Sequence, residues 1–172
     1  MTTDMTRGSV GKTLIKYSLP IMLSAVFQQL YSISDSIIAG NFAGKEALAA
    51  IGASYPVTMI FISVATGFST GSTVVISRLF GQKNMGEVKT AICTSLLSAG
   101  VLSILLTVLG LILCNPMIAA LQTTPDIFAN SSAYLGIFCG GLFFLFLYNS
   151  CNGVFLALGD SKTPLYLLIL SS

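Results

Sequence analysis

The sequence predicts an all-α integral membrane protein, and three observations lead to this fold class. First, 54% of the 172 residues are hydrophobic and only 8% are charged, whereas soluble domains carry about a quarter charged residues. Second, the mean hydropathy is +0.88. Third, the uncharged stretches provide the roughly 20 residues that a membrane-spanning helix needs, and they are far longer than the strands of a membrane barrel. We therefore expect helices that cross a bilayer.

Apolar segments divide the chain into four predicted transmembrane helices and the start of a fifth. The predicted spans cover residues 14–42, 53–79, 90–113 and 127–158, and the fifth begins at residue 164. The fifth segment reaches residue 172, which is less than half the length needed to cross a bilayer. We therefore expect the chain to be a fragment of a longer protein.

Polar and helix-breaking residues mark the boundaries of these spans. Gly44–Glu46 is expected to connect the first two spans, and Asn115–Pro116 is expected to end the third. Thr124–Asp126 has the residues of a helix start: a capping threonine, a proline at the first helical position and an acid in the first turn. Gly159 is expected to end the fourth span.

Small residues are placed for close packing between helices. Gly67 and Gly71 lie four residues apart, as do Gly136 and Gly140, so each pair forms a face that another helix can approach closely. The four cysteines lie in or beside apolar segments without a Cys-x-x-Cys spacing. We interpret them as small core residues rather than as a disulfide framework; they are Cys93, Cys114, Cys139 and Cys151.

The basic residues predict the orientation in the membrane. With alternate loops on opposite sides, one side receives seven of the eight Lys and Arg residues and the other receives only Lys45. Because cytoplasmic loops are enriched in Lys and Arg, we expect a multi-pass protein of the cell membrane with a cytoplasmic N-terminus. The residues on the expected cytoplasmic side are Arg7, Lys12, Lys16, Arg78, Lys83, Lys89 and Lys162.

One acidic residue lies within the first span. Ser24, Gln28, Tyr31 and Asp35 are spaced four, three and four residues apart, so they lie on one face of a helix. An ionised Asp in the middle of a bilayer costs about 3 kcal/mol on insertion scales. Protonation, a bound cation or pairing with another group lowers this cost. Asp35 is therefore either a coupling site for H⁺ or Na⁺, or a neutral, hydrogen-bonded Asp that joins two helices.

Two amides lie near the end of the fourth span. Asn149 and Asn152 are three residues apart on one face, next to Tyr148. Amides in lipid must either hydrogen-bond to a neighbouring helix or line a cavity, and both alternatives stay open. The chain has no histidine, which excludes a His-ligated metal site and a His general base. With a single intramembrane acid and no His, we expect no enzyme activity.

Several short stretches follow one another in a specific order and spacing over nearly the whole chain. They are Leu19-Pro20, Gln28–Tyr31 with Asp35, Gly40 and Gly44 with Ala47–Gly52, Ser77–Lys83, Thr124–Asp126, Tyr148-Asn149 with Asn152, and Gly159–Pro164. Each stretch alone is a weak signal. Together they resemble the multidrug and toxic compound extrusion (MATE) family of secondary transporters, in particular its bacterial multidrug branch.

The resemblance implies twelve spans in two six-helix lobes, with a central cavity that opens alternately to each side of the membrane. Residues 1–172 then form part of the N-terminal lobe, and the C-terminal lobe of the same protein is missing. Asp35 matches the acid that binds the coupling H⁺ or Na⁺, and the resemblance implies no cofactor and no other metal. Gln28, Tyr31, Asn149 and Asn152 match polar positions that line the cavity.

We therefore expect a cation-coupled antiporter that exports drugs or other xenobiotics across the plasma membrane by alternating access. The expected partners are membrane lipid and a cationic, lipophilic small molecule, with no nucleic acid. One alternative is a flippase for lipid-linked precursors, which would need a more basic cavity, whereas the basic residues here lie in loops. The other is a non-functional truncated remnant, since four and a half spans supply one incomplete lobe.

Overall fold

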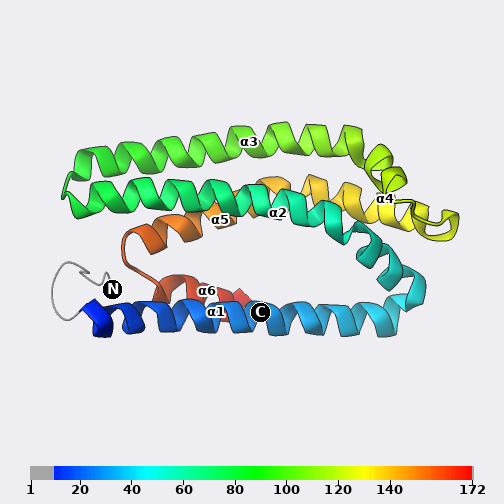
Figure 1. The fold of residues 1–172 in the computed structure, drawn as a ribbon, viewed down its shortest axis with the longest axis horizontal. Helices are drawn as coiled ribbons and strands as arrows, with labels where there is room; N and C mark the ends of the chain where they lie inside the picture. The colour runs from blue at the N-terminus through cyan, green and yellow to red at the C-terminus, as the bar shows by residue number, and fades with distance from the viewer. Residues whose placement is uncertain (1–9, 172) are drawn as a thin grey trace.

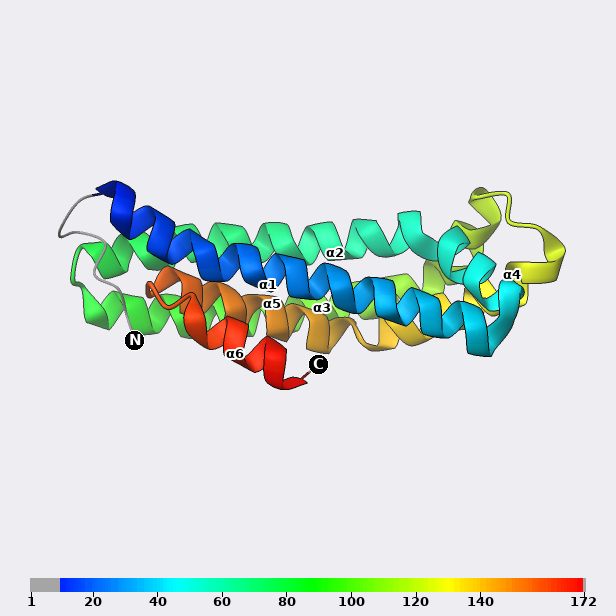
Figure 2. The same cartoon turned by 90° about the horizontal axis from the view of Figure 1, so that it is seen from below.

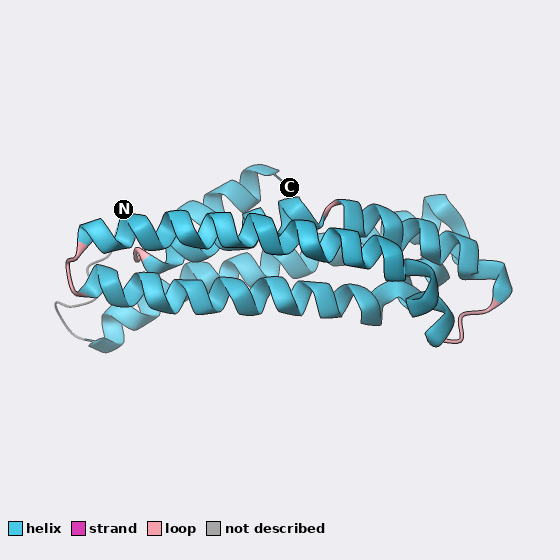
Figure 3. Ribbon diagram, turned by 90° about the horizontal axis from the view of Figure 1, so that it is seen from above, coloured by secondary structure: helices cyan, strands magenta, loops and turns pink. Residues whose placement is uncertain are grey.

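A computed structural model describes residues 10–171, and within this range the chain is helical with short turns (Figures 1 and 3). The all-α part of the predicted fold class is therefore confirmed. Arg7, which contributes to the predicted orientation, lies outside the described residues. The elements are α1 Val10–Ile38, the π-helix η1 Ala39–Ala43, α2 Gly44–Gly81, α3 Met85–Ala120, α4 Pro125–Gly140, α5 Leu142–Ala157 and α6 Lys162–Ser171.

Three long units form the main bundle: α2, α3 and the consecutive pair α4–α5. α2 packs against α3, α4 and α5, and α3 packs against α4 and α5. An apolar cluster stabilises each end of the bundle. The cluster at one end consists of Ile76, Val88 and Ala157. The cluster at the other end consists of Val57, Phe61, Cys114, Ile118, Leu135, Cys139 and Leu142.

Close approach within the bundle occurs at two glycines, Gly110 of α3 and Gly153 of α5. A Cβ at Gly110 would lie 2.7 Å from Cys139 Sγ, and a Cβ at Gly153 would lie 2.6 Å from Ser69 Oγ. The glycine pairs that the sequence predicts to pack closely against another helix do not do so here. No atom lies within 4 Å of a Cβ placed at Gly67 or Gly71, or at the pair in α4, Gly136 and Gly140. The prediction of close packing at these pairs is wrong within the described chain, because spacing alone does not specify which helix faces them.

α1 and α6 lie together on one side of the bundle (Figures 1 and 2). α1 packs against α6 and against η1, which leads directly into α2. Gly44 has a φ of +84°, a left-handed conformation that glycine adopts readily. The sharp change of direction from η1 to α2 therefore occurs at a residue that tolerates it.

Three boundaries differ from the sequence-based expectation. Gly44–Glu46 is the first turn of α2 rather than a connecting loop, and α3 continues through Pro116 to Ala120. A proline inside a membrane helix is tolerated because neighbouring groups satisfy the freed carbonyl. The predicted fourth span is two helices, α4 and α5, bent by 47°. Gly140 and Gly141 are adjacent at this bend, and glycines are a common cause of helix kinks.

The predicted starts and ends around α4 and α6 are confirmed. Thr124 occupies the N-cap position of α4 with Pro125 at its first helical position, although the Thr124 side chain makes no capping hydrogen bond. Gly159, with a φ of +79°, lies between α5 and α6. Local residue chemistry was sufficient at these positions because a helix terminus depends on residues adjacent in the sequence.

Among the described helices, α2 and α3 are long and apolar enough to cross a membrane, and α4 with α5 is a third candidate when the bent pair counts as one span. α1 has 29 residues but is not one of these candidates. Its Gln, Ser, Tyr and Asp residues lower its hydropathy. Composition alone therefore supports two or three of the four complete predicted spans.

Candidate functional site

The polar face of α1 carries the candidate site. Ser24 Oγ donates a hydrogen bond to the Pro20 carbonyl of the same helix at 3.0 Å. Tyr31 is half exposed and Asp35 is exposed. Among the described residues, no hydrogen bond or ion pair reaches the Asp35 carboxylate. In the described part of the chain, Asp35 therefore has no partner on another helix, as the helix-joining alternative would require.

Gln28 connects the polar face of α1 to α5. Its Nε2 donates to Tyr148 Oη at 3.2 Å. Tyr148 precedes Asn149 on α5, so the structure brings one predicted residue of α1 next to the predicted amide region. Asp35 lies seven residues beyond Gln28, or about 10 Å along the helix axis at 1.5 Å per residue. The Asp35 carboxylate and the contact between Gln28 and Tyr148 therefore lie on the same face of α1, about two helical turns apart.

The two amides on α5 have different surroundings. Asn149 Nδ2 donates to the Leu145 carbonyl of its own helix at 2.8 Å, and the Asn149 carbonyl accepts from Ser69 Oγ of α2 at 2.6 Å. One N–H of its side chain thus bonds within α5, while its backbone joins α5 to α2. Asn152 is partly buried, and no side-chain hydrogen bond to another described residue is found for it. Asn152 therefore has free hydrogen-bonding capacity within the described chain.

Tyr17 was not singled out by the sequence. Its hydroxyl donates to the Leu156 carbonyl at 2.7 Å, in the last turn of α5, and the same carbonyl also accepts from the Gly159 backbone N–H at 3.0 Å. It provides a second connection between α1 and α5. No local pattern could have identified it, because the partner is 139 residues away in the sequence.

The described residues contain no group of three or more His, Cys, Asp or Glu side chains that could hold a metal ion. Asp35 therefore acts chemically as a single carboxylate on a polar helix face. Such a group can take up a proton, or can serve as one ligand of a cation whose other oxygen ligands come from elsewhere.

The chain is similar to known proteins over nearly its whole length. A family model described as MatE matches residues 20–172. The probable multidrug resistance proteins YoeA and YpnP of Bacillus subtilis are 28% identical over 172 residues and 32% identical over 162 residues. The aligned regions cover 100% and 94% of this chain.

A solved structure has the same fold. It is described as the outward-facing conformation of a multidrug resistance MATE family transporter of the MOP superfamily. It superposes with a TM-score of 0.90 at 25% identity, over 99% of this chain and 38% of that chain. The chain spans 37% of the length of YoeA and 36% of YpnP. The similarity therefore covers little more than a third of each complete protein.

Proposed function

Because the chain belongs to the MatE family of multidrug and toxic compound extrusion transporters, we propose that it forms part of the N-terminal lobe of a cation-coupled antiporter that exports drugs. The protein is a membrane transporter rather than an enzyme. In this proposal α1, α2, α3 and the bent pair α4–α5 are four transmembrane helices, and α6 begins a fifth. The lower hydropathy of α1 fits a helix that faces a cavity rather than lipid.

The observation that carries the proposal is the unpartnered carboxylate of Asp35 on the polar face of α1. An ionised carboxylate costs about 3 kcal/mol at the bilayer centre, so uptake of H⁺ or Na⁺ lowers the free energy of the state in which Asp35 is dehydrated. If one state of the transporter binds the ion more tightly, ion binding shifts the population towards that state. Asp35 is the coupling residue in this proposal.

The contact between Gln28 and Tyr148 connects Asp35 to the rest of the lobe. α1 is joined to α5 by this hydrogen bond and by the bond from Tyr17 to Leu156. A change of charge at Asp35 would alter how α1 packs, and these contacts would pass the change to α5. Gln28, Tyr31, Asn149 and Asn152 are proposed to line the polar side of the cavity.

The remaining parts of the proposal concern partners and orientation. The substrate is proposed to be a lipophilic cation, and the cavity is completed by a C-terminal lobe like those of the longer relatives. The charge distribution supports a cytoplasmic N-terminus in the cell membrane: Arg78, Lys83 and Lys89 lie at the turn between α2 and α3, and Lys45 lies at the opposite end of α2.

The test is the substitution Asp35→Asn in the full-length protein, measured under a cation gradient as export of rhodamine 6G from whole cells or as its uptake into inverted membrane vesicles. We expect loss of gradient-driven export at normal expression, since an amide cannot change charge. Asp126→Asn, an acid in the first turn of α4, is the matched control and should export normally. Wild-type export by Asp35→Asn would contradict the coupling role.

A further inference from the structure

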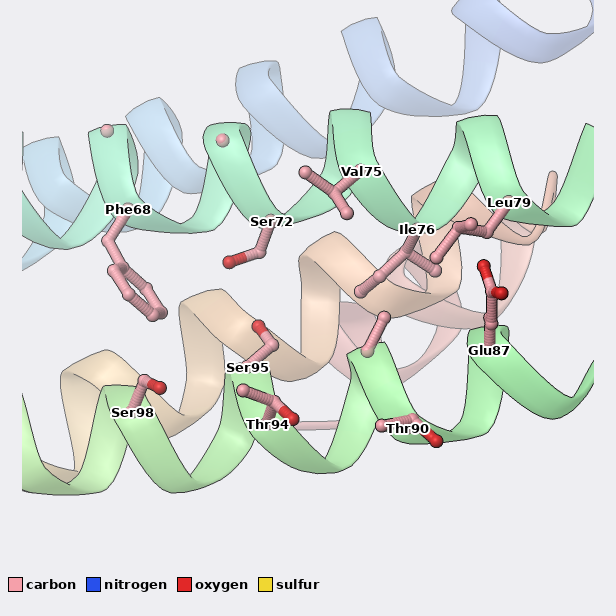
Figure 4. Close-up of a pocket in the computed structure, with 13 residues that line it drawn as sticks. Phe68, Ser72, Val75, Ile76, Leu79, Glu87, Thr90, Thr94, Ser95 and Ser98 are labelled. Carbon is pink, nitrogen blue, oxygen red and sulfur yellow. The ribbon is translucent and has the colours of Figure 1, made fainter.

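A groove of about 680 Å³ lies between α2 and α3, away from the polar face of α1. Figure 4 shows the two helices on either side of the groove. Gly67 and Gly71 of α2 line it, and no atom lies within 4 Å of a Cβ placed at either glycine. Phe68 and Val75 add apolar surface. The groove therefore exists because small residues leave space between the two helices.

The length of the groove matches one leaflet of a membrane. Gly67 and Leu79 both line it, and twelve residues rise about 18 Å along a helix. Half of a hydrocarbon core about 30 Å thick is similar. Because α2 and α3 are both candidate spans, the groove extends from the turn between them, at the membrane surface, to about the middle of the bilayer. An acyl chain of one leaflet therefore matches it in length.

A carboxylate lies at the end of the groove that is nearest the turn. Figure 4 shows Glu87 extending from the first turn of α3 towards Leu79 of α2, and both residues line the groove. Glu87 is exposed, and its carboxylate makes no hydrogen bond or ion pair with another described residue. The excess of basic residues that membrane proteins carry on one side does not account for an acid here. The Glu87 carboxylate is therefore available to a cationic group of a ligand.

Two basic residues lie at the same end of the groove. Arg78 follows Val75 by three residues, so the two share a side of α2. The turn after α2 folds back on the helix, since the Asn84 N–H donates to the Leu79 carbonyl at 3.3 Å, and this keeps Lys83 close to the end of the groove. Both basic side chains are exposed, and neither makes an ion pair with a described residue.

Lys89 lies on the opposite side of α3 from the groove. Two residues turn a helix by about 200°, and Lys89 is two residues from Glu87 and two residues from Ala91, which both line the groove. The end of the groove therefore presents one acid with two bases beside it rather than a uniformly basic surface.

We infer that the groove between α2 and α3 binds phosphatidylethanolamine, a phospholipid whose headgroup carries both a phosphate and a primary ammonium. The ammonium meets Glu87, the phosphate meets Arg78 and Lys83, and one acyl chain lies along the groove. A primary ammonium donates charge-assisted hydrogen bonds to a carboxylate, whereas the methyl groups of choline prevent them.

The two signs of charge select this headgroup over others. An anionic headgroup would place no cation against Glu87. A lipophilic cation would lie beside Arg78 and Lys83 with no anion for either of them. Binding of phosphatidylethanolamine requires only that α2 and α3 span a membrane, and it does not depend on the role of Asp35.

The test uses the full-length protein in phosphatidylcholine nanodiscs that contain a small fraction of phosphatidylethanolamine with a diazirine on one acyl chain. Mass spectrometry locates the crosslinked residues. Val75 lines the groove and is 55% exposed, whereas Leu105 of α3 is 62% exposed and does not line it. We expect labelling around Val75 to saturate and to be displaced by unlabelled phosphatidylethanolamine but not by an equal amount of phosphatidylglycerol. Labelling around Leu105 should rise in proportion to the probe.

Three substitutions separate the charges of the headgroup, with phosphatidylglycerol carrying the same diazirine chain as a second probe. Glu87→Gln should weaken phosphatidylethanolamine labelling around Val75 roughly fivefold or more, since a charge-assisted contact is lost, and should abolish the preference over phosphatidylglycerol. Arg78→Gln should weaken labelling by both lipids. Lys89→Gln is the matched control, because it removes a base on the far side of α3, and it should leave labelling unchanged.

Four outcomes would overturn the inference. Equal displacement by phosphatidylglycerol would show that the headgroup is not recognised, and wild-type labelling of the Glu87→Gln protein would exclude the acid. An equal loss in Lys89→Gln and Arg78→Gln would show a non-specific attraction to bases. Absence of lipid labelling around Val75 would show that another segment of the full-length protein covers the groove.

Asp35→Asn separates this site from the transport proposal. The substitution should stop export and leave lipid labelling around Val75 intact. Normal export with intact labelling would refute only the coupling role of Asp35.

Discussion

Gly153 lies where α5 meets the hydroxyl groups of α2. A Cβ at this position would stand 2.6 Å from both Ser69 Oγ and Thr73 Oγ1. Thr73 donates to the Ser69 carbonyl at 2.8 Å, so neither hydroxyl can move without breaking a hydrogen bond. At the residue scale, this glycine sets the distance between two helices of the bundle, and the same contact includes the hydrogen bond from Ser69 to Asn149.

Gly153→Ala should therefore destabilise the protein by about 1–3 kcal/mol, the usual cost of overpacking, although alanine favours a helix by up to about 1 kcal/mol. Gly136→Ala is the control, because nothing lies within 4 Å of a Cβ there, and it should be neutral or slightly stabilising. Thermal unfolding of the full-length protein in detergent measures both. Equal melting temperatures for the two variants would show that the helices separate freely at Gly153.

At the scale of elements, Asp160 organises the start of α6. Its Oδ1 accepts from the backbone N–H groups of Lys162 and Thr163, each at 3.1 Å, and its Oδ2 accepts from Thr163 Oγ1 at 2.7 Å. Burial tends to raise the pKa of Asp160, but hydrogen bonds, including those from Thr163 and Lys162, lower it, and the pKa lies below its usual value. The ionised carboxylate thus satisfies backbone donors that the first turn of a helix leaves free.

Asp160→Ala should lower stability at neutral pH by about 1 kcal/mol, as for the loss of an N-cap. Because the folded pKa lies below the unfolded value of about 3.9, the stabilisation is present above that value and is lost as the pH falls through the folded pKa. The difference between wild type and Asp160→Ala should therefore shrink in acid. Denaturation curves of the wild-type and Asp160→Ala proteins at pH 7 and at pH 3 measure it. If the difference in stability between the two proteins stays constant with pH, the ionised carboxylate of Asp160 is not its source.

At the scale of the whole molecule, α1 is separate from the bundle formed by α2, α3, α4 and α5. Apart from η1 and α6, its links to the other helices include the hydrogen bonds from Tyr17 and Gln28 to α5. Many of its large apolar residues are more than half exposed, such as Ile15 and Met22. α1 therefore requires lipid or further protein around it.

Tyr17→Phe should increase amide hydrogen exchange in the first turns of α1 while exchange in α2 and α3 stays unchanged, since it removes a side-chain hydrogen bond from α1 to α5. Tyr55→Phe is a matched control, because Tyr55 is 57% exposed on α2. Hydrogen exchange with mass spectrometry on the full-length protein in detergent resolves these helices. Faster exchange throughout the bundle would show that α1 and the bundle open together.

Much of the fold was predictable because it depends on neighbours in the sequence. Long apolar stretches predicted helices, Thr124–Asp126 predicted the start of α4, and Gly159 predicted the break before α6. The continuation of α3 through Pro116 was not predictable, since the cost of a proline depends on what surrounds the helix. The site was predictable as a polar face on α1, and the roles of its residues stay predictions.

The sequence by itself determined that the chain is helical, where most helices lie, and that Asp35 shares a face with Gln28 and Tyr31, because periodicity and composition are local properties. Tertiary structure alone decided which residues meet. It joined Tyr17 to Leu156 and Gln28 to Tyr148, placed Gly153 in close contact, and left Gly67 and Gly71 facing a groove. These contacts depend on distances between segments far apart in the chain, which no local pattern encodes.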